Sequence, residues 1–329
     1  MTNFKKIYLF IFISFLLLLV FILSINVTNK YKKRINSLSN ENYSYEINKK
    51  NNTFGNSELT SFYEPKPNST ENITADWLGY EIEITMNNDG LNDRYDYELY
   101  KPLNTFRIVT LGDSHTYGVY LKTQDNWSEK LEDILNRQLN CPQYKKFEVI
   151  NLGVHGYDLM YSFERFKKRG LKYNPDLIIW FVNNWNFQNI NEYYYPRREE
   201  LLKMGYKDFN GKNSKFEISE KIFKELPEMY GKNGILDYQK KVIDNLRVVF
   251  KNRLLFVSYN DLGKTSEEFF EDFTKTEKRI SFLKLSFNSN SSQELFFPDR
   301  HPNQKGHFKI SEELYKNLIS STLKGCITN

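Results

Sequence analysis

The stretch that decides the fold runs from Arg107 to Gly118 and reads Arg-Ile-Val-Thr-Leu-Gly-Asp-Ser-His-Thr-Tyr-Gly. A β-branched apolar run ends abruptly at Gly112, and the apolar residues that follow, as far as Leu139, recur at helical spacing. The sequence therefore predicts a strand, a tight turn and a helix. Such a junction lifts Ser114 to the carboxyl end of a strand, beside the N–H groups that begin the next helix. Simple capping of the helix by Asp113 or Ser114 explains the same residues.

Three more polar blocks accompany this turn. They are Asn151–Gly156, Val182–Asn186 and Phe297–His307. In the last block, Asp299 and His301 stand two residues apart, so an extended segment places both side chains on one side. A serine hydroxyl needs a base to take its proton, and the base works best when an acid holds it in one tautomer. Ser114, His301 and Asp299 are therefore the candidate nucleophile, base and orienting acid, with a turn and helix cap as the plain alternative for the last two.

With these four blocks in order, the chain resembles the SGNH (GDSL-type) serine hydrolases from about Asn87 to Leu323. The fourth residue of the family's first block is usually Leu or Phe, and His115 departs from that pattern without altering the nucleophile. The resemblance implies hydrolysis of an ester through an acyl-enzyme on Ser114, with no cofactor.

The resemblance also implies the donors that stabilise the negative charge on the attacked carbonyl oxygen. They are the backbone N–H of Ser114, the N–H of Gly156 and an Asn side chain of the third block. The family usually shows Gly-x-Asn-Asp in that block, whereas this chain has Val182-Asn183-Asn184-Trp185-Asn186. We expect Asn184 to be the donor, with Asn183 and Asn186 as alternatives. A plain turn glycine that needs φ > 0 is the alternative for Gly156.

Apolar runs and amphipathic stretches alternate along the rest of the chain. Strands are predicted at 108–111, 147–152, 177–182, 254–259 and about 280–287, and helices at 126–139, 159–169, 235–250, about 266–275 and 304–323. Strands separated by helices imply parallel pairing, and continuous apolar runs imply burial on both faces. Together with the resemblance, this predicts an α/β fold: a three-layer αβα sandwich around a mostly parallel, five-stranded, flavodoxin-like sheet.

The N-terminus has a different composition. Residues 1–6 form a short tail, and 7–27 are apolar enough to cross a membrane, at about 1.5 Å per residue and a core of about 30 Å. A cleaved signal peptide is the alternative, but no Ala-x-Ala pattern follows. Residues 28–75 read as a polar linker, and 76–329 as the hydrolase domain, with an insertion at about 187–232.

Charge is concentrated beside the apolar segment. Of the net +5, six positive charges and no negative ones precede residue 35, which leaves −1 for the remainder (5 − 6). The excess of positive charge therefore lies on either side of the predicted membrane segment. The sequence shows no module of basic and aromatic residues that would suggest nucleic-acid binding. Basic residues on both flanks leave the orientation open: the charge rule favours a cytoplasmic domain, whereas a surface substrate favours an extracytoplasmic one, which we expect.

A metal site would have to draw on His115, His155 and His301 together with Asp113 and Asp299. Gly-Asp-x-His resembles the start of calcineurin-like metallophosphoesterases, but their later Asn-His and Gly-His-x-His blocks are missing, so no metal is expected. His307, at the start of the last helix, is expected to be a packing or surface residue.

The two cysteines are Cys141 and Cys326. The resemblance places the first and last helices on one face of the sheet, so a disulfide is possible in an oxidising compartment, and two free thiols are the alternative.

The resulting hypothesis is a membrane-anchored serine esterase acting on an acyl group, for example O-acetyl, of a glycan or lipid. The same residues would serve an O-acyltransferase of surface polysaccharide, and a catalytically silent binding domain is a third possibility. The Tyr-rich insertion between Asn191 and Tyr230, which includes Tyr193–Tyr195, is either a carbohydrate-binding rim or an ordinary packed insertion.

Overall fold

A central parallel sheet organises the domain. The computed structural model describes residues 59–75, 77–207, 217–231 and 233–328. Its five-stranded sheet has the order β5-β3-β6-β7-β8, and every neighbouring pair is parallel. The strands are β3 (Thr105–Leu111), β5 (Lys146–Asn151), β6 (Leu177–Phe181), β7 (Arg253–Ser258) and β8 (Ile280–Lys284). The predicted parallel sheet is thus confirmed, with every expected strand in place.

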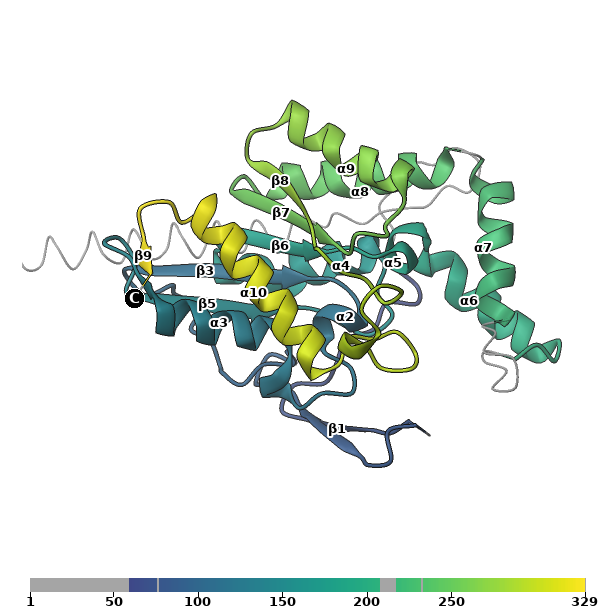
Figure 1. The fold of residues 1–329 in the computed structure, drawn as a ribbon. Coiled ribbons are helices and arrows are strands. Elements are labelled where there is room, and N and C mark those ends of the chain that lie inside the picture. Colours follow the sequence, from purple (N-terminus) through teal and green to yellow (C-terminus); the bar gives the residue numbers. More distant parts are fainter. Residues whose placement is uncertain (1–58, 76, 208–216, 232, 329) are drawn as a thin grey trace, which may run out of the picture. The chain divides into compact units, whose positions relative to one another are not determined.

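Helices cover both faces of this sheet, as Figure 1 shows. On one face α3 (Trp127–Gln138) and α10 (Gln304–Ser320) lie side by side, and on the other lie α4 (Leu159–Arg165), α8 (Gly234–Val249) and α9 (Lys264–Thr276). Alternate strand residues face opposite layers: Ile108 packs with α3 and α10, whereas Val109 packs with the other helices. This is the predicted three-layer αβα sandwich. A π-helical turn follows α4 at Phe166–Gly170.

The predicted insertion is helical where it is described. It consists of α5 (Asn184–Gln188), α6 (Asn191–Lys203) and α7 (Glu217–Tyr230), and α6 packs against α7. Tyr194 is buried, and Tyr193 donates a hydrogen bond to Glu225 at 2.8 Å. The tyrosines of α6 are therefore packed into the fold, as the plainer of the two expectations for them had it.

Residues 59–75 differ from the expectation of a linker that ends at residue 75. They pack on the domain, and β1 (Thr70–Ile73) pairs antiparallel with β2 (Ile82–Thr85). The sequence shows no apolar periodicity here, yet Leu59 and Phe62 pack against the core, and hydrogen bonds and ion pairs hold the segment as well. The predicted membrane segment 7–27 lies outside the described residues. Within the part that is described, no helix combines the length and the apolar character needed to span a bilayer.

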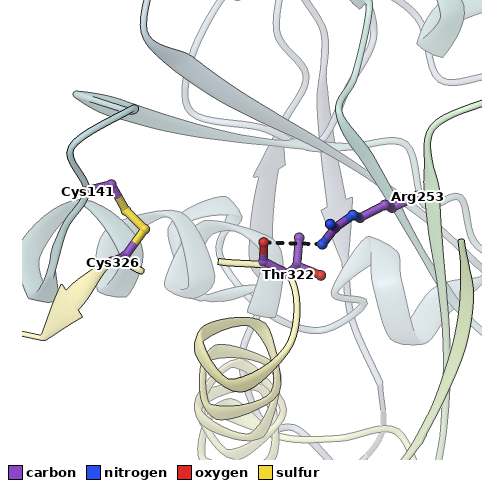
Figure 2. The surroundings of a disulfide bond; sticks show 4 residues. All are labelled: Cys141, Arg253, Thr322 and Cys326. Carbon is purple, nitrogen blue, oxygen red and sulfur yellow. Dashed lines mark hydrogen bonds between the residues drawn. A yellow bond between two sulfur atoms is a disulfide. The ribbon is translucent and has the colours of Figure 1, made fainter. Parts of the chain in front are cut away.

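Cys141 and Cys326 form a disulfide, and their Cα atoms are 4.3 Å apart (Figure 2). Next to it, β4 (Leu139–Asn140) pairs with β9 (Ile327–Thr328), so the segments after α3 and α10 are joined twice. Arg253 Nη1 donates to the carbonyl of Thr322 at 3.2 Å, which attaches the same segment to the start of β7. Of the two alternatives for these cysteines, the structure contains the pair.

Candidate active site

Ser114 lies in the turn that links β3 to the short helix α2 (Ser114–Tyr117). Asp113 caps this helix by accepting a hydrogen bond from the His115 N–H at 3.0 Å. A Cβ atom at Gly112 would stand 2.3 Å from Thr116 Oγ1 and 2.9 Å from the Phe181 carbonyl oxygen, so the turn requires glycine. Because Asp113 fills the capping role, the Ser114 hydroxyl remains available for another partner.

That partner is His301. Ser114 Oγ lies 2.9 Å from His301 Nε2, and His301 Nδ1 lies 2.8 Å from Asp299 Oδ2. The carboxylate accepts a hydrogen bond from Nδ1–H, which assigns the tautomer in which Nε2 is free to accept the serine proton. The structure therefore brings together all three residues that the sequence singled out for this role.

Asp299 is held from two directions. Its Oδ1 accepts from the His301 backbone N–H at 3.2 Å, and Tyr120 donates a further side-chain hydrogen bond. Partial burial opposes ionisation, but the hydrogen bonds and charge of His301, with the Tyr120 bond, hold the pKa of Asp299 below its ordinary value. The carboxylate is thus charged whenever His301 needs an acceptor.

Two other histidines surround this group. The His115 ring lies 5.1 Å from that of His301, and its Nδ1 is 3.0 Å from the Tyr259 hydroxyl. Burial, with repulsion from His301, pushes the pKa of His115 well below its ordinary value, so His115 adds no positive charge beside His301. His155 is exposed to solvent, and its ring centroid lies 6.3 Å from that of His301.

The second block curves around the nucleophile turn. A Cβ at Gly153 would lie 2.5 Å from the Tyr117 backbone nitrogen, so the loop and α2 touch backbone to backbone. Gly156 has φ +77°, and its carbonyl accepts from Asn191 Nδ2 at 2.9 Å and the Tyr195 hydroxyl at 3.0 Å. Among the described residues, none accepts a hydrogen bond from the Gly156 N–H.

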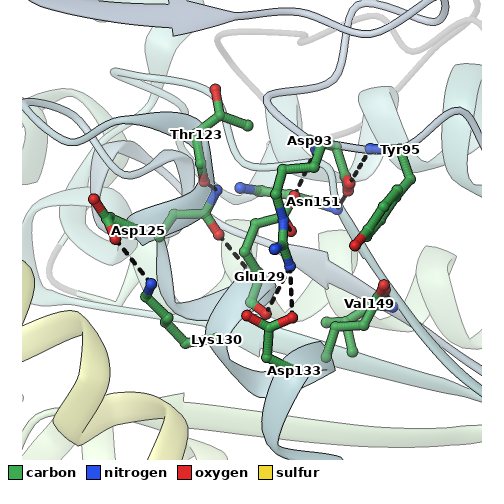
Figure 3. A network of polar contacts seen from close by, with 12 residues as sticks. Asp93, Tyr95, Thr123, Asp125, Glu129, Lys130, Asp133, Val149 and Asn151 are labelled. Atoms are coloured by element: carbon green, nitrogen blue, oxygen red, sulfur yellow. Dashed lines mark hydrogen bonds and ion pairs between the residues drawn. The ribbon is translucent and has the colours of Figure 1, made fainter. Parts of the chain in front are cut away.

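A polar network around Asp93 and Asn151 holds the second block against α2 (Figure 3). Asn151 donates from its backbone to Asp93 at 3.1 Å and from its side chain to the Thr116 carbonyl at 3.1 Å, which links the second block to α2. Burial, with the neighbouring carboxylate of Glu129, raises the pKa of Asp93 well above its ordinary value. Arg94 offsets part of the negative charge of this network by forming ion pairs with Glu129 and Asp133.

The third block differs from the expectation for Asn184. The exposed Asn184 side chain donates to the Asp261 carbonyl at 2.8 Å and is not brought to Ser114. Asn183 instead donates from Nδ2 to the Oδ2 of Asp113, the residue before Ser114, at 2.7 Å, and also caps α5. The reason is the position of the strand end: β6 stops at Phe181, so the turn residue Asn183 faces β3 while Asn184 already belongs to a helix.

His307 is buried, not on the surface. Its Nδ1 accepts the Trp127 backbone N–H at 3.0 Å, and Trp127 Nε1 in turn donates to the His115 carbonyl at 3.0 Å. This chain of bonds was not apparent from the sequence, and it connects α10 to the nucleophile turn through α3. Within the described ranges, no group of three or more His, Cys, Asp or Glu side chains is arranged to hold a metal ion.

No protein-family model matches the sequence, and neither does any curated protein. Similar solved structures include a GDSL-like lipase from Bacteroides thetaiotaomicron, with 12% identity, 66% of this chain and 89% of that chain covered, and a TM-score of 0.36. A psychrotrophic esterase from Pseudoalteromonas has 14% identity, coverages of 66% and 97%, and a TM-score of 0.41. A family 3 carbohydrate esterase from Clostridium thermocellum has 16% identity, coverages of 66% and 96%, and a TM-score of 0.36.

All three of these proteins are esterases or lipases, and the first carries the GDSL name that the sequence motifs suggest. Their likeness to this chain is too distant to support an activity.

Proposed function

We propose that the protein is a serine esterase of the SGNH type. The observation that carries this proposal is the unbroken hydrogen-bonded chain from Ser114 through His301 to Asp299. His301 Nε2 would take the hydroxyl proton while Oγ attacks the ester carbonyl, and Asp299 would stabilise the imidazolium that forms. His301 then returns the proton to the departing alcohol, which leaves an acyl group on Ser114.

The attacked carbonyl oxygen becomes negative and needs fixed donors. We assign this role to the backbone N–H groups of Ser114 and Gly156 and to the second amide proton of Asn183. The bond from Asn183 to Asp113 supports the choice of this asparagine, because it uses one N–H and fixes the direction of the other. Water activated by His301 would then release the acid.

We further propose that the domain is extracytoplasmic, tethered by residues 7–27, and acts on an acyl ester of a glycan or lipid. The Cys141–Cys326 disulfide supports this location, because such bonds persist in oxidising compartments. A sugar hydroxyl in place of water would make the same residues an O-acyltransferase, and accumulation of an acylated sugar would distinguish the two.

The decisive experiment compares the full-length protein in detergent with Ser114→Ala. Wild type should hydrolyse p-nitrophenyl acetate and react with a fluorophosphonate at Ser114, and the variant should lose at least about 10⁴-fold in rate and all labelling. Ser286→Ala is the control, because Ser286 is exposed and, among the described residues, its side chain bonds to Glu313 alone. Absence of both hydrolysis and labelling in wild type would identify a silent binding domain.

A further inference from the structure

Residues 59–64 form a strap that ends beside the active site. Near its start, the Glu192 carboxylate of α6 accepts from the Thr60 N–H at 3.0 Å and from the Ser61 N–H at 3.1 Å. At its end, Glu64 pairs with Arg165 of α4 at 2.9 Å, where the arginine side chain is buried. The strap is therefore anchored to two helices, with Tyr63 between the anchors.

Tyr63 packs among other aromatic rings and extends toward the second block. Its ring centroid lies 5.3 Å from that of Tyr157 and 5.8 Å from that of Tyr195. Its hydroxyl donates to the carbonyl of His155 and lies 3.0 Å from the Tyr195 hydroxyl. A Cβ at Gly156 would be 2.8 Å from the Tyr63 hydroxyl, so the side chain lies directly on this loop.

The His155 carbonyl and the Gly156 N–H belong to one peptide group. The described chain has no cis peptide bonds, so this group is planar and trans, and its C=O and N–H point in opposite directions. A hydrogen bond to the carbonyl therefore fixes the direction of the N–H. It also polarises the peptide, which makes that N–H a stronger donor.

We infer that Tyr63 is a positioning residue that aims the Gly156 N–H at the developing oxyanion. Tyr195 and Asn191 hold the following peptide through the Gly156 carbonyl, so the strap and α6 grip both sides of this glycine. This inference rests on the proposed esterase activity. It gives the segment that precedes the sheet a part in the chemistry.

The test is Tyr63→Phe in the full chain, which removes the hydroxyl and keeps the ring. We expect kcat for p-nitrophenyl acetate to fall about 10- to 100-fold with little change in KM, since a donor aimed wrongly costs less than one removed. Inhibition by phenylboronic acid, whose tetrahedral adduct places an oxygen in the same position, should weaken in parallel. Rates are normalised to the fraction of sites that fluorophosphonate labels at completion.

Tyr193→Phe is the matched control, because its hydroxyl lies on the same helix as Tyr195 but bonds Glu225, and it should behave as wild type. Unchanged normalised kcat and boronate inhibition in Tyr63→Phe would overturn the inference. A lower fraction of labelled sites and a lower melting temperature, at unchanged normalised kcat, would show a purely structural role and overturn it too. Hydrolysis that still depends on Ser114 in either case would leave the proposed esterase intact.

Discussion

At the carboxyl ends of the strands Ser114 and His301 meet through a hydrogen bond, whereas at the opposite end of the sheet Cys141 and Cys326 are joined covalently. The disulfide lines a hollow together with Phe106 and Arg253, which lie at the amino ends of β3 and β7. Both links join a segment near α3 to a segment near α10. Distant parts of the chain are thus connected by a hydrogen bond at one end of the sheet and by a disulfide at the other.

Because of this difference, we expect the two ends of the sheet to affect different quantities: the stability of the fold at one end and the rate of turnover at the other. A covalent link resists unfolding but does no chemistry, whereas a hydrogen bond can be made and broken during each turnover. We therefore expect changes at the disulfide end to alter the melting temperature and leave kcat alone, and changes at the Ser114 end to do the reverse.

The largest effect is expected at the disulfide. The two cysteines are 185 residues apart in sequence, and a loop of that size is worth about 5 kcal/mol in the chain-entropy account, with about 2–5 kcal/mol typical of measurements. The double variant Cys141→Ser and Cys326→Ser should lower the free energy of unfolding by that amount in urea titrations. Its kcat at 25 °C should stay within about twofold, and a large loss of kcat in the folded variant would refute the separation.

The next effect distinguishes the two neighbouring asparagines. Asn183→Ala removes the proposed oxyanion donor and should lower kcat about 10²- to 10³-fold, whereas Asn184→Ala, which loses only a bond to the Asp261 carbonyl, should stay within about twofold. Steady-state kinetics on the two purified variants decide the matter. The reverse ranking would restore Asn184 as the donor.

The smallest effect concerns the pH dependence of stability. Burial lowers the pKa of His307 to about 3, while in the unfolded chain the pKa is about 6.5. Below about pH 6.5 the unfolded state therefore binds a proton on His307 that the folded state does not. This residue leaves the free energy of unfolding unchanged above about pH 6.5 and lowers it progressively as the pH falls toward 3. His307→Asn keeps an acceptor for the Trp127 N–H and should show a shallower loss of stability between pH 6.5 and 4 in urea titrations. Equal slopes for the two proteins would contradict this.

Most of the fold could be predicted from the sequence because parallel strands that are buried on both faces appear as continuous runs of apolar residues. Leu177–Phe181 shows this directly, since every residue in it is buried. The strap could not be predicted in the same way. Its contacts with Glu192 and Arg165 join residues more than 100 positions apart, and polar pairs of that kind leave no periodic pattern.

The site was predictable as far as the motifs reached. Ser114, Asp299 and His301 carry fixed spacing and a recognisable setting, and the structure joins them. Asn183 and Asn184 differ only in which one follows the strand end, and strand boundaries are the weakest part of any reading of sequence. Tyr63 had no signal of its own, because its role depends on the direction of a peptide group.

The bond between Ser114 and His301 spans 187 positions of the chain. During synthesis the turn that carries Ser114 leaves the ribosome long before His301, and α10, which follows His301, packs on α3 only after nearly all of the described sheet has been made. A partly translated chain therefore holds a serine without a proton acceptor. The proposed ester cleavage should consequently begin only when folding is complete, so that its appearance would report the finished fold.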